Sequence, residues 1–154
     1  MTATGEREVL GLDVGPSEDG AFWRSFLRGL VARGLSGVKL VTSDDHEGLK
    51  GAIAAVLQGA GWQRCRVRKT GNVTQKVREA GLPEVKADIL SAYYASRQEV
   101  ARLVADAVVK KWQAVYPSAM ASFVDDFEAC IAYLRCPPAH HKFIRTANLA
   151  ERAI

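Results

Sequence analysis

The sequence contains little cysteine, and the few cysteines present follow no recognisable pattern. Cys65, Cys130 and Cys136 give an odd number, three, without the short paired spacing of a zinc site. Small secreted domains held together by disulfides contain more cysteines, usually in even numbers. We therefore expect reduced thiols in a cytoplasmic protein, with neither a disulfide framework nor structural zinc.

Long apolar runs are also missing. No stretch approaches the roughly 20 consecutive apolar residues that a membrane-spanning helix needs. The first residues are polar and lack the apolar core of a signal peptide. Hydrophobic residues make up 48% of the 154 residues and charged residues 25%, which is ordinary for a globular domain and excludes wholesale disorder. The sequence thus predicts a soluble protein with a substantial core and no membrane partner.

Acidic residues are absent between Glu47 and Glu79, within a chain whose formal net charge is +4. Basic side chains in such a window can contact the phosphates of DNA and release condensed counterions. The candidate DNA-binding residues are Arg64, Arg66, Arg68 and Lys69. The alternative is a solvated strand-and-loop face without a nucleic-acid partner.

Short aliphatic runs alternate with helical spacing in the first part of the chain. The predicted strands are Glu8–Val14, Lys39–Thr42 and Trp62–Val67, and the predicted helices are Ala21–Ala32 and Gly48–Leu57. This order is typical of an α/β fold in which parallel strands are joined by right-handed crossovers.

From Asn72 onward the pattern is helical only. Helices are predicted over Leu82–Tyr94 and over Arg97–Val115. A third, capped by Ser118 or Ser122, carries Phe123, Phe127, Ile131 and Leu134 and is broken by Cys136-Pro137-Pro138. The last residues, Thr146 to Ile154, have the pattern of a further helix beginning.

Two adjacent aspartates, Asp44 and Asp45, follow the predicted strand Lys39–Thr42 and precede a helix. Open α/β sheets bind ligands at the carboxyl ends of their strands, and Mg²⁺ or Mn²⁺ prefers carboxylate oxygen. Asp44 is therefore the first candidate for a metal ligand. Aspartate is also a preferred helix N-cap, so the alternative is that one of the pair caps the next helix.

Other polar clusters give weaker indications. Asp125, Asp126 and Glu128 could form a second metal cluster, but such runs more often lie on an exposed helical face. His140 and His141 are adjacent, which is poor geometry for shared ligation from a helix, so we expect surface residues.

Several separate motifs resemble the Mutator-type transposases of bacterial insertion sequences. The run from Ala32 to Leu49, which includes Ser43-Asp44-Asp45-His46-Glu47-Gly48, resembles one of their motifs. Gly11–Asp19, Trp62–Val67 and Asn148–Arg152 resemble three more, in the same order. The resemblance extends from about Glu8 to Arg152.

This resemblance implies a ribonuclease-H-like core with a triad of two aspartates and a glutamate, in which Asp44 is the second aspartate and Glu151 the glutamate. It implies Mg²⁺ or Mn²⁺ as the cofactor, held by Asp44 and Glu151, and insertion-sequence DNA as the partner. The resemblance also implies three divisions of the chain. Residues 1–71 would form a partial catalytic core of about three strands with flanking helices, and residues 72–141 would form an all-helical insertion. Residues 142–154 would be the start of the helix that carries the last carboxylate.

The chain also departs from the family pattern. The first catalytic aspartate of the family lies upstream of Glu8, so Asp13 does not correspond to it, and Arg68 replaces a histidine. We expect a fragment that lacks the first aspartate and the N-terminal DNA-binding region and is inactive alone. Alternatives are a non-catalytic DNA-binding remnant and a small metal-dependent phosphohydrolase centred on Asp44. Exposed sheet edges could also make the chain a homo-oligomer.

Overall fold

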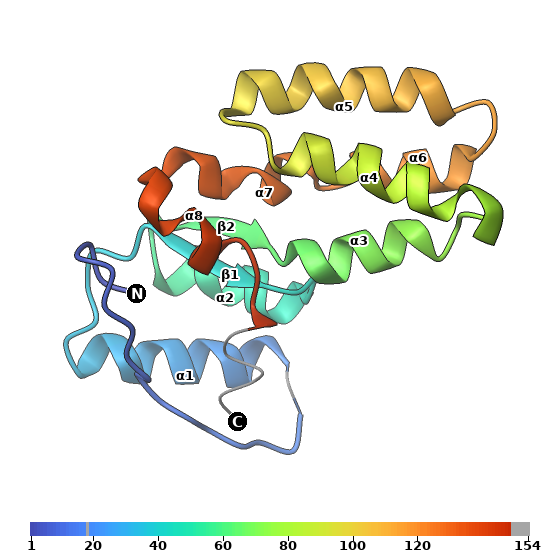
Figure 1. Cartoon of the computed structure of the whole chain (residues 1–154). Coiled ribbons are helices and arrows are strands. Elements are labelled where there is room, and N and C mark those ends of the chain that lie inside the picture. Colours follow the sequence, from blue (N-terminus) through green and yellow to red (C-terminus); the bar gives the residue numbers. More distant parts are fainter. Residues whose placement is uncertain (18, 149–154) are drawn as a thin grey trace. The chain divides into compact units, whose positions relative to one another are not determined.

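The computed structural model describes residues 1–17 and 19–148, most of which are helical (Figure 1). The helices are α1 (Gly20–Ala32), α2 (Glu47–Val56), α3 (Arg66–Thr74), α4 (Leu82–Tyr93), α5 (Gln98–Trp112), α6 (Pro117–Val124), α7 (Phe127–Cys130) and α8 (His141–Ile144). Short 3₁₀ turns are η1 (Glu79–Gly81), η2 (Ala132–Arg135) and η3 (Pro138–His140). The strands are β1 (Leu40–Ser43) and β2 (Gly61–Arg64). None of the described helices combines the length and apolar content needed to cross a membrane.

The chain forms two compact units that divide within the strands. The first unit contains residues 1–41 and 45–62, and the second contains residues 42–44 together with the chain from Gln63 onward.

The first unit is built on the packing of α1 against α2. Its buried core contains Leu27, Leu49, Ala52, Ile53 and Leu57, which recur at the three- and four-residue spacing of helix faces. Asp19 caps α1, because its Oδ1 accepts the backbone N–H of Phe22 at 2.9 Å.

Glycine at position 48 permits a close contact between these two helices. A Cβ atom added there would lie 2.8 Å from the backbone nitrogen of Gly20. Any side chain at this position would therefore push the first turns of α1 and α2 apart.

The second unit has a helical core formed mainly by α3, α4, α5 and α6. Tyr93, Phe123 and Phe127 pack at its centre with ring centroids 5.4 to 6.0 Å apart, the range in which aromatic pairs attract. Valines, alanines and Ile89 fill the remaining space on α4 and α5. Between residues 72 and 148 all of the described secondary structure is helical, as the sequence predicted.

The two strands pair as parallel neighbours, with α2 between them in the chain. The N–H of Gly61 donates to the carbonyl of Lys39 at 2.9 Å, and that of Cys65 donates to the carbonyl of Ser43 at 2.6 Å. Both donors and both acceptors are four residues apart in the same direction, which is a parallel register. The strand ends that carry Asp44 and Cys65 are therefore neighbours within the second unit.

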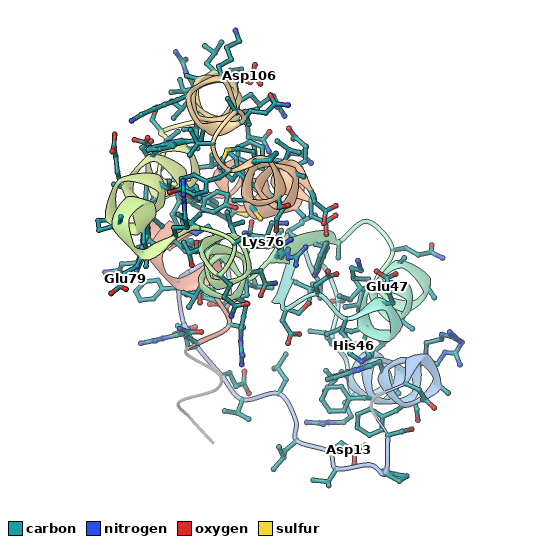
Figure 2. All side chains as sticks on the ribbon, turned by 90° about the vertical axis from the view of Figure 1, so that its right-hand side faces the viewer. Asp13, His46, Glu47, Lys76, Glu79 and Asp106 are labelled. Atoms are coloured by element: carbon teal, nitrogen blue, oxygen red, sulfur yellow. The ribbon has the colours of Figure 1, made fainter. Side chains whose placement is uncertain are left out.

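The sheet of the described residues has two strands, whereas the sequence predicted about three. The predicted strand Glu8–Val14 is wrong: this segment has no regular secondary structure and pairs with no strand, and Val9, Leu12 and Val14 are 75 to 87% exposed. Asp13 lies on this segment, as Figure 2 shows. An isolated extended run needs a hydrogen-bonded neighbour to become a strand, and the first unit provides none here.

The predicted strand Trp62–Val67 is shorter in the structure, because β2 ends at Arg64 and α3 begins at Arg66. Four residues of α3 are buried at helical spacing: Arg66, Lys69, Thr70 and Val73. Three of them are polar, so the buried face of this helix has no apolar signal in the sequence.

Candidate functional site

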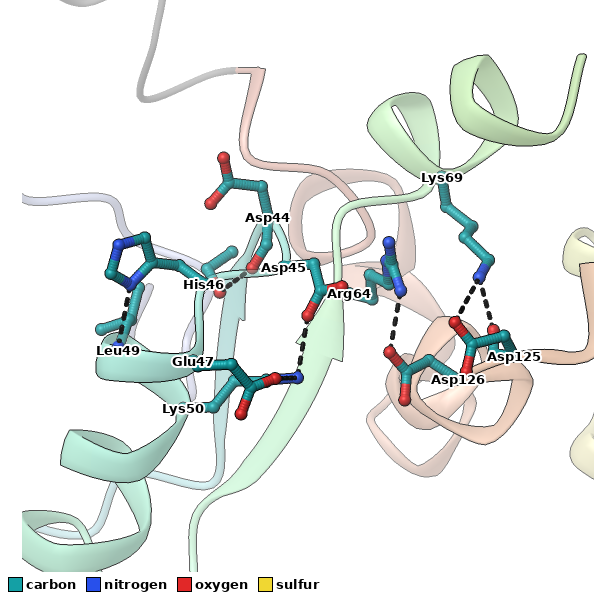
Figure 3. A network of polar contacts seen from close by, with 11 residues as sticks. Asp44, Asp45, His46, Glu47, Leu49, Lys50, Arg64, Lys69, Asp125 and Asp126 are labelled. Carbon is teal, nitrogen blue, oxygen red and sulfur yellow. Dashed lines mark hydrogen bonds and ion pairs between the residues drawn. The ribbon is translucent and has the colours of Figure 1, made fainter. Parts of the chain in front are cut away.

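Asp44 directly follows β1, belongs to the second unit, and is exposed. Among the described residues, no hydrogen bond or ion pair involves its carboxylate, and Figure 3 draws that carboxylate without a contact. Within residues 1–17 and 19–148, its oxygens are thus available to an added ligand.

The neighbouring carboxylate, Asp45, is already paired in the first unit. Its Oδ1 lies 2.8 Å from Nζ of Lys50, which also contacts Glu47 at 2.5 Å (Figure 3). The hydrogen bonds to Asp45 and then to Glu47 raise the pKa of Lys50, so this lysine stays charged at neutral pH. The structure therefore distinguishes the two adjacent aspartates, whose surroundings looked alike in the sequence: Asp45 is paired with Lys50, and Asp44 has no partner among the described residues.

Helix α2 is capped by His46. The Nδ1 atom of its ring accepts the backbone N–H of Leu49 at 3.2 Å, which requires the hydrogen to be on Nε2. The alternative that Asp44 or Asp45 caps this helix is therefore wrong. Neither carboxylate is used for capping.

The ends of the two strands hold a segment from much later in the chain. Thr42 Oγ1 donates to the carbonyl of Ile144 at 2.5 Å, and the sulfur of Cys65 lies 3.3 Å from Thr146 Oγ1. The N–H of Ala147 also donates to this sulfur, at 3.4 Å. The sequence-predicted glutamate, Glu151, lies outside the described residues.

Three of the four candidate DNA-binding residues are buried: Arg64, Arg66 and Lys69. Arg64 Nη1 donates to Asp126 Oδ2 at 2.8 Å, and Lys69 Nζ donates to the backbone carbonyl of Asp125 at 2.5 Å (Figure 3). Burial, followed by the charge of Arg64, lowers the pKa of Lys69. These cations face protein groups, which leaves their side chains little surface for a phosphate.

Arg66 is surrounded by aromatic rings. Its Nη1 donates to the carbonyl of Tyr93 at 3.0 Å, and its guanidinium lies 4.2 Å from the ring centre of Tyr94 and 5.1 Å from that of Tyr133. Arg145 lies 4.5 Å from the same Tyr94 ring. Such stacking holds a guanidinium in place within a core that would otherwise disfavour its charge.

Arg68, the fourth candidate, is exposed on α3. Lys76 and Arg78, in the same window without acidic residues, are exposed as well. The sequence could not distinguish these residues from the buried ones, because all are basic and closely spaced.

The acidic residues Asp125, Asp126 and Glu128 have protein partners. Glu128 accepts two hydrogen bonds from Arg102, at 2.7 and 2.8 Å, and these lower its pKa. Asp125 and Asp126 contact Lys69 and Arg64. Over residues 1–17 and 19–148, no three His, Cys, Asp or Glu side chains gather as a metal site, so the idea of a second metal cluster finds no support.

Asp44, which has no partner among the described residues, thus lies at the carboxyl end of a parallel strand and just ahead of a helix, the region where open α/β sheets bind their ligands. A family model described as "Transposase, Mutator family" matches residues 1–153. The chain belongs to the Mutator family of transposases.

Curated relatives agree with this assignment. The chain is 34% identical over 153 residues to the transposase for insertion sequence element IS406 of Burkholderia multivorans, and 32% identical over 148 residues to that for ISRM5 of Rhizobium meliloti. These matches cover 99% and 96% of the chain but 39% and 37% of the relatives. The transposase for IS1081 of Mycobacterium tuberculosis is 50% identical over 93 residues, which are 60% of the chain and 22% of that relative. The chain thus spans well under two thirds of the relatives it matches.

Sequence reasoning missed Thr42 and Cys65 as contacts of the late segment 144–147. One signal was present in the sequence. Cys65 lies within a motif that resembles the family, yet it is a free cysteine, which indicates a structural role other than a disulfide.

Proposed function

We propose that the chain is a fragment of a transposase with the two-aspartate, one-glutamate triad and acts on the DNA of insertion-sequence ends. In this proposal Asp44 and Glu151 supply two of the carboxylates that hold Mg²⁺ or Mn²⁺. The observation that carries it is the exposed Asp44 carboxylate, which has no partner among the described residues while Asp45 beside it is paired with Lys50. The relatives are transposases for insertion sequence elements, which supports the substrate class.

The described residues fit such a metal only in part. Asp44 offers the hard oxygen ligand that Mg²⁺ and Mn²⁺ prefer, but no further carboxylate, histidine or cysteine pair gathers with it in the part of the chain that the structure describes. The proposal therefore assigns the second carboxylate to Glu151. With two carboxylates instead of three, we expect weak metal binding.

Divalent ions bound there would activate the attacking oxygen and stabilise the leaving oxygen during displacement at phosphorus. The carboxylate of Asp44 would be a metal ligand at a fixed position, because pairing with β2 fixes the end of β1. The family resemblance places the remaining aspartate upstream of Glu8. We therefore propose that these 154 residues alone transfer no DNA strands.

Calorimetric titration with Mn²⁺ tests the metal assignment. We expect Asp44→Ala and Glu151→Ala each to weaken binding by about tenfold or more, since each removes a charged ligand. The matched control is Asp45→Ala, which removes a neighbouring carboxylate that is already paired and should change the affinity by less than about twofold. Equal losses for Asp44→Ala and Asp45→Ala, or no binding by the unmodified chain, would refute the assignment.

A second candidate function, DNA binding without cleavage, is favoured by the exposed basic residues of the window without acidic residues. DNA affinity should fall with salt, and each phosphate contact contributes about 0.9 to the slope of log K against log salt. Arg68→Ala should therefore reduce the slope by about 0.9, whereas Arg64→Ala should leave it unchanged because Arg64 is buried. Fluorescence anisotropy at several salt concentrations measures both slopes. An unchanged slope for Arg68→Ala would remove this residue from the interface.

A further inference from the structure

We infer that Cys65 is a positioning residue: its buried thiol fixes residues 144–147 against the ends of β1 and β2, and so sets where the chain enters the segment that contains Glu151. The link to Glu151 rests on the proposed function. The anchoring of residues 144–147 does not depend on that proposal.

The thiol of Cys65 acts here as a hydrogen-bonding group. The residue is fully buried. Its sulfur accepts a hydrogen bond from the N–H of Ala147 at 3.4 Å and lies 3.3 Å from the hydroxyl oxygen of Thr146. These partners are 82 and 81 residues later in the chain. A part-buried backbone N–H needs an acceptor, and a thiol sulfur is a weak one.

Two further contacts continue this anchoring along consecutive residues. The hydroxyl of Thr42, at the same end of the sheet, donates to the carbonyl of Ile144 at 2.5 Å. The N–H of Arg66 points to the carbonyl of Arg145 at 3.4 Å. Each residue from 144 to 147 thus contacts Thr42, Cys65 or Arg66, and all three belong to the second unit.

The same strand ends carry Asp44. Cys65 is in register with Ser43, whose carbonyl accepts the Cys65 N–H at 2.6 Å, and Asp44 is the next residue. On the other side, Thr146 Oγ1 accepts the N–H of Asn148 at 3.2 Å. Cys65 therefore contacts both Ser43, the residue before Asp44, and Thr146, which is five residues before Glu151 in the sequence.

Other roles of a cysteine fit this position less well. A nucleophilic or redox-active thiol needs access and an activating environment, whereas Cys65 is 0% exposed and is not disulfide-bonded. A metal role has no support, because the described residues form no group of three potential ligands. Acceptance of a hydrogen bond is the role that remains for the sulfur.

Amide-resolved hydrogen exchange by NMR on the 154-residue protein tests the anchoring. In Cys65→Ala, which removes the acceptor, the amides of Ala147 and Asn148 should exchange about fivefold faster or more. Cys65→Ser should restore much of the protection, since a hydroxyl oxygen also accepts an N–H. Cys130→Ala is the matched control: it removes another fully buried cysteine of the second unit, whose sulfur makes no hydrogen bond to residues 144–147, and should leave both amides unchanged.

Mn²⁺ titration of the same variants supplies the second readout. If Cys65 positions the segment that contains Glu151, Cys65→Ala should lose affinity as Glu151→Ala does, and Cys65→Ser should regain it. Faster exchange at Ala147 in a protein that binds no Mn²⁺ in any form would support the anchoring and refute the proposed function.

Unchanged exchange at Ala147 in a folded Cys65→Ala protein would overturn the inference. If that variant does not fold, Cys65→Val decides, because it fills the buried site with an apolar side chain and offers no acceptor to the N–H of Ala147. The exchange of Ala147 and Asn148 in Cys65→Val should rise by a similar factor. The inference is overturned if it stays at the unmodified value.

Discussion

The ion pair between Arg64 and Asp126 provides a quantitative test of how the helical part of the second unit is held to β2. The two side chains meet at 2.8 Å, with 6% of Arg64 and 33% of Asp126 exposed. Asp126 also has a backbone φ of 53°, in the left-handed region. Asparagine tolerates this conformation well, so Asp126→Asn removes the charge without adding backbone strain.

The expected magnitude follows from these two observations. A hydrogen bond to a charged group contributes about 1.5–3 kcal/mol and a neutral one about 0.5–1.5 kcal/mol. Because solvent reaches a third of Asp126, we expect Asp126→Asn to lower the free energy of unfolding by about 1–2 kcal/mol. Asp126→Ala should cost about 3 kcal/mol, since it removes the acceptor entirely and places alanine at positive φ.

Urea unfolding followed by circular dichroism measures these differences. Asp126→Gly is the control for the backbone: it lacks the carboxylate as alanine does, yet glycine adopts positive φ freely, so it should be about 1 kcal/mol more stable than Asp126→Ala. A change below about 0.5 kcal/mol for Asp126→Asn would show that Arg64 does not depend on this charge. That result would refute the reasoning that burial and pairing take Arg64 away from DNA.

Two further predictions concern titratable groups. Burial tends to raise the pKa of Asp88, but hydrogen bonds from Lys111 and Trp112 outweigh it and bring the pKa below its usual value. The stability that ionised Asp88 contributes is present above the unfolded pKa of about 3.9 and is lost as the pH falls through the folded pKa. In urea unfolding, Asp88→Asn should therefore lower the free energy of unfolding by about 1 kcal/mol at pH 7 and by progressively less below about pH 4. An equal loss at both pH values would contradict the lowered pKa. Burial raises the pKa of the Cys130 thiol to about 11, and Cys130 is 0% exposed. A thiol reagent at pH 8 should therefore modify the partly exposed Cys136 first and the other two cysteines only after unfolding, and early modification of Cys130, located by mass spectrometry, would contradict this order.

Helices with an apolar face could be predicted well from the sequence. The predicted helix Ala21–Ala32 corresponds to α1 (Gly20–Ala32), and Leu82–Tyr94 corresponds to α4 (Leu82–Tyr93), because apolar residues recur there at helical spacing. Helix α3 could not be predicted in this way. Its buried face carries Arg66 and Lys69, whose burial depends on groups that are distant in sequence.

The candidate site shows the same limit. Local sequence placed Asp44 correctly at the end of β1, but it could not reveal that His46 would cap α2 or that Lys50 would pair with Asp45. The partners of Arg64 and Lys69 lie 62 and 56 residues further along the chain. Contacts at that separation in sequence decide whether a basic side chain is buried. The exposure of each basic residue therefore has no local signal in the sequence and can be seen only in the structure.

The close approach of the backbone at Gly48 to Gly20 limits which substitutions the chain can accumulate. A Cβ atom at position 48 would meet backbone at 2.8 Å, whereas one at Gly51, a turn further along α2, would meet nothing within 4 Å. In a library of all amino acids at both positions, folded variants should be almost confined to glycine at 48 and broadly distributed at 51. Genetic drift in a copy of this gene that is no longer under selection would therefore damage the first unit sooner at Gly48 than at Gly51.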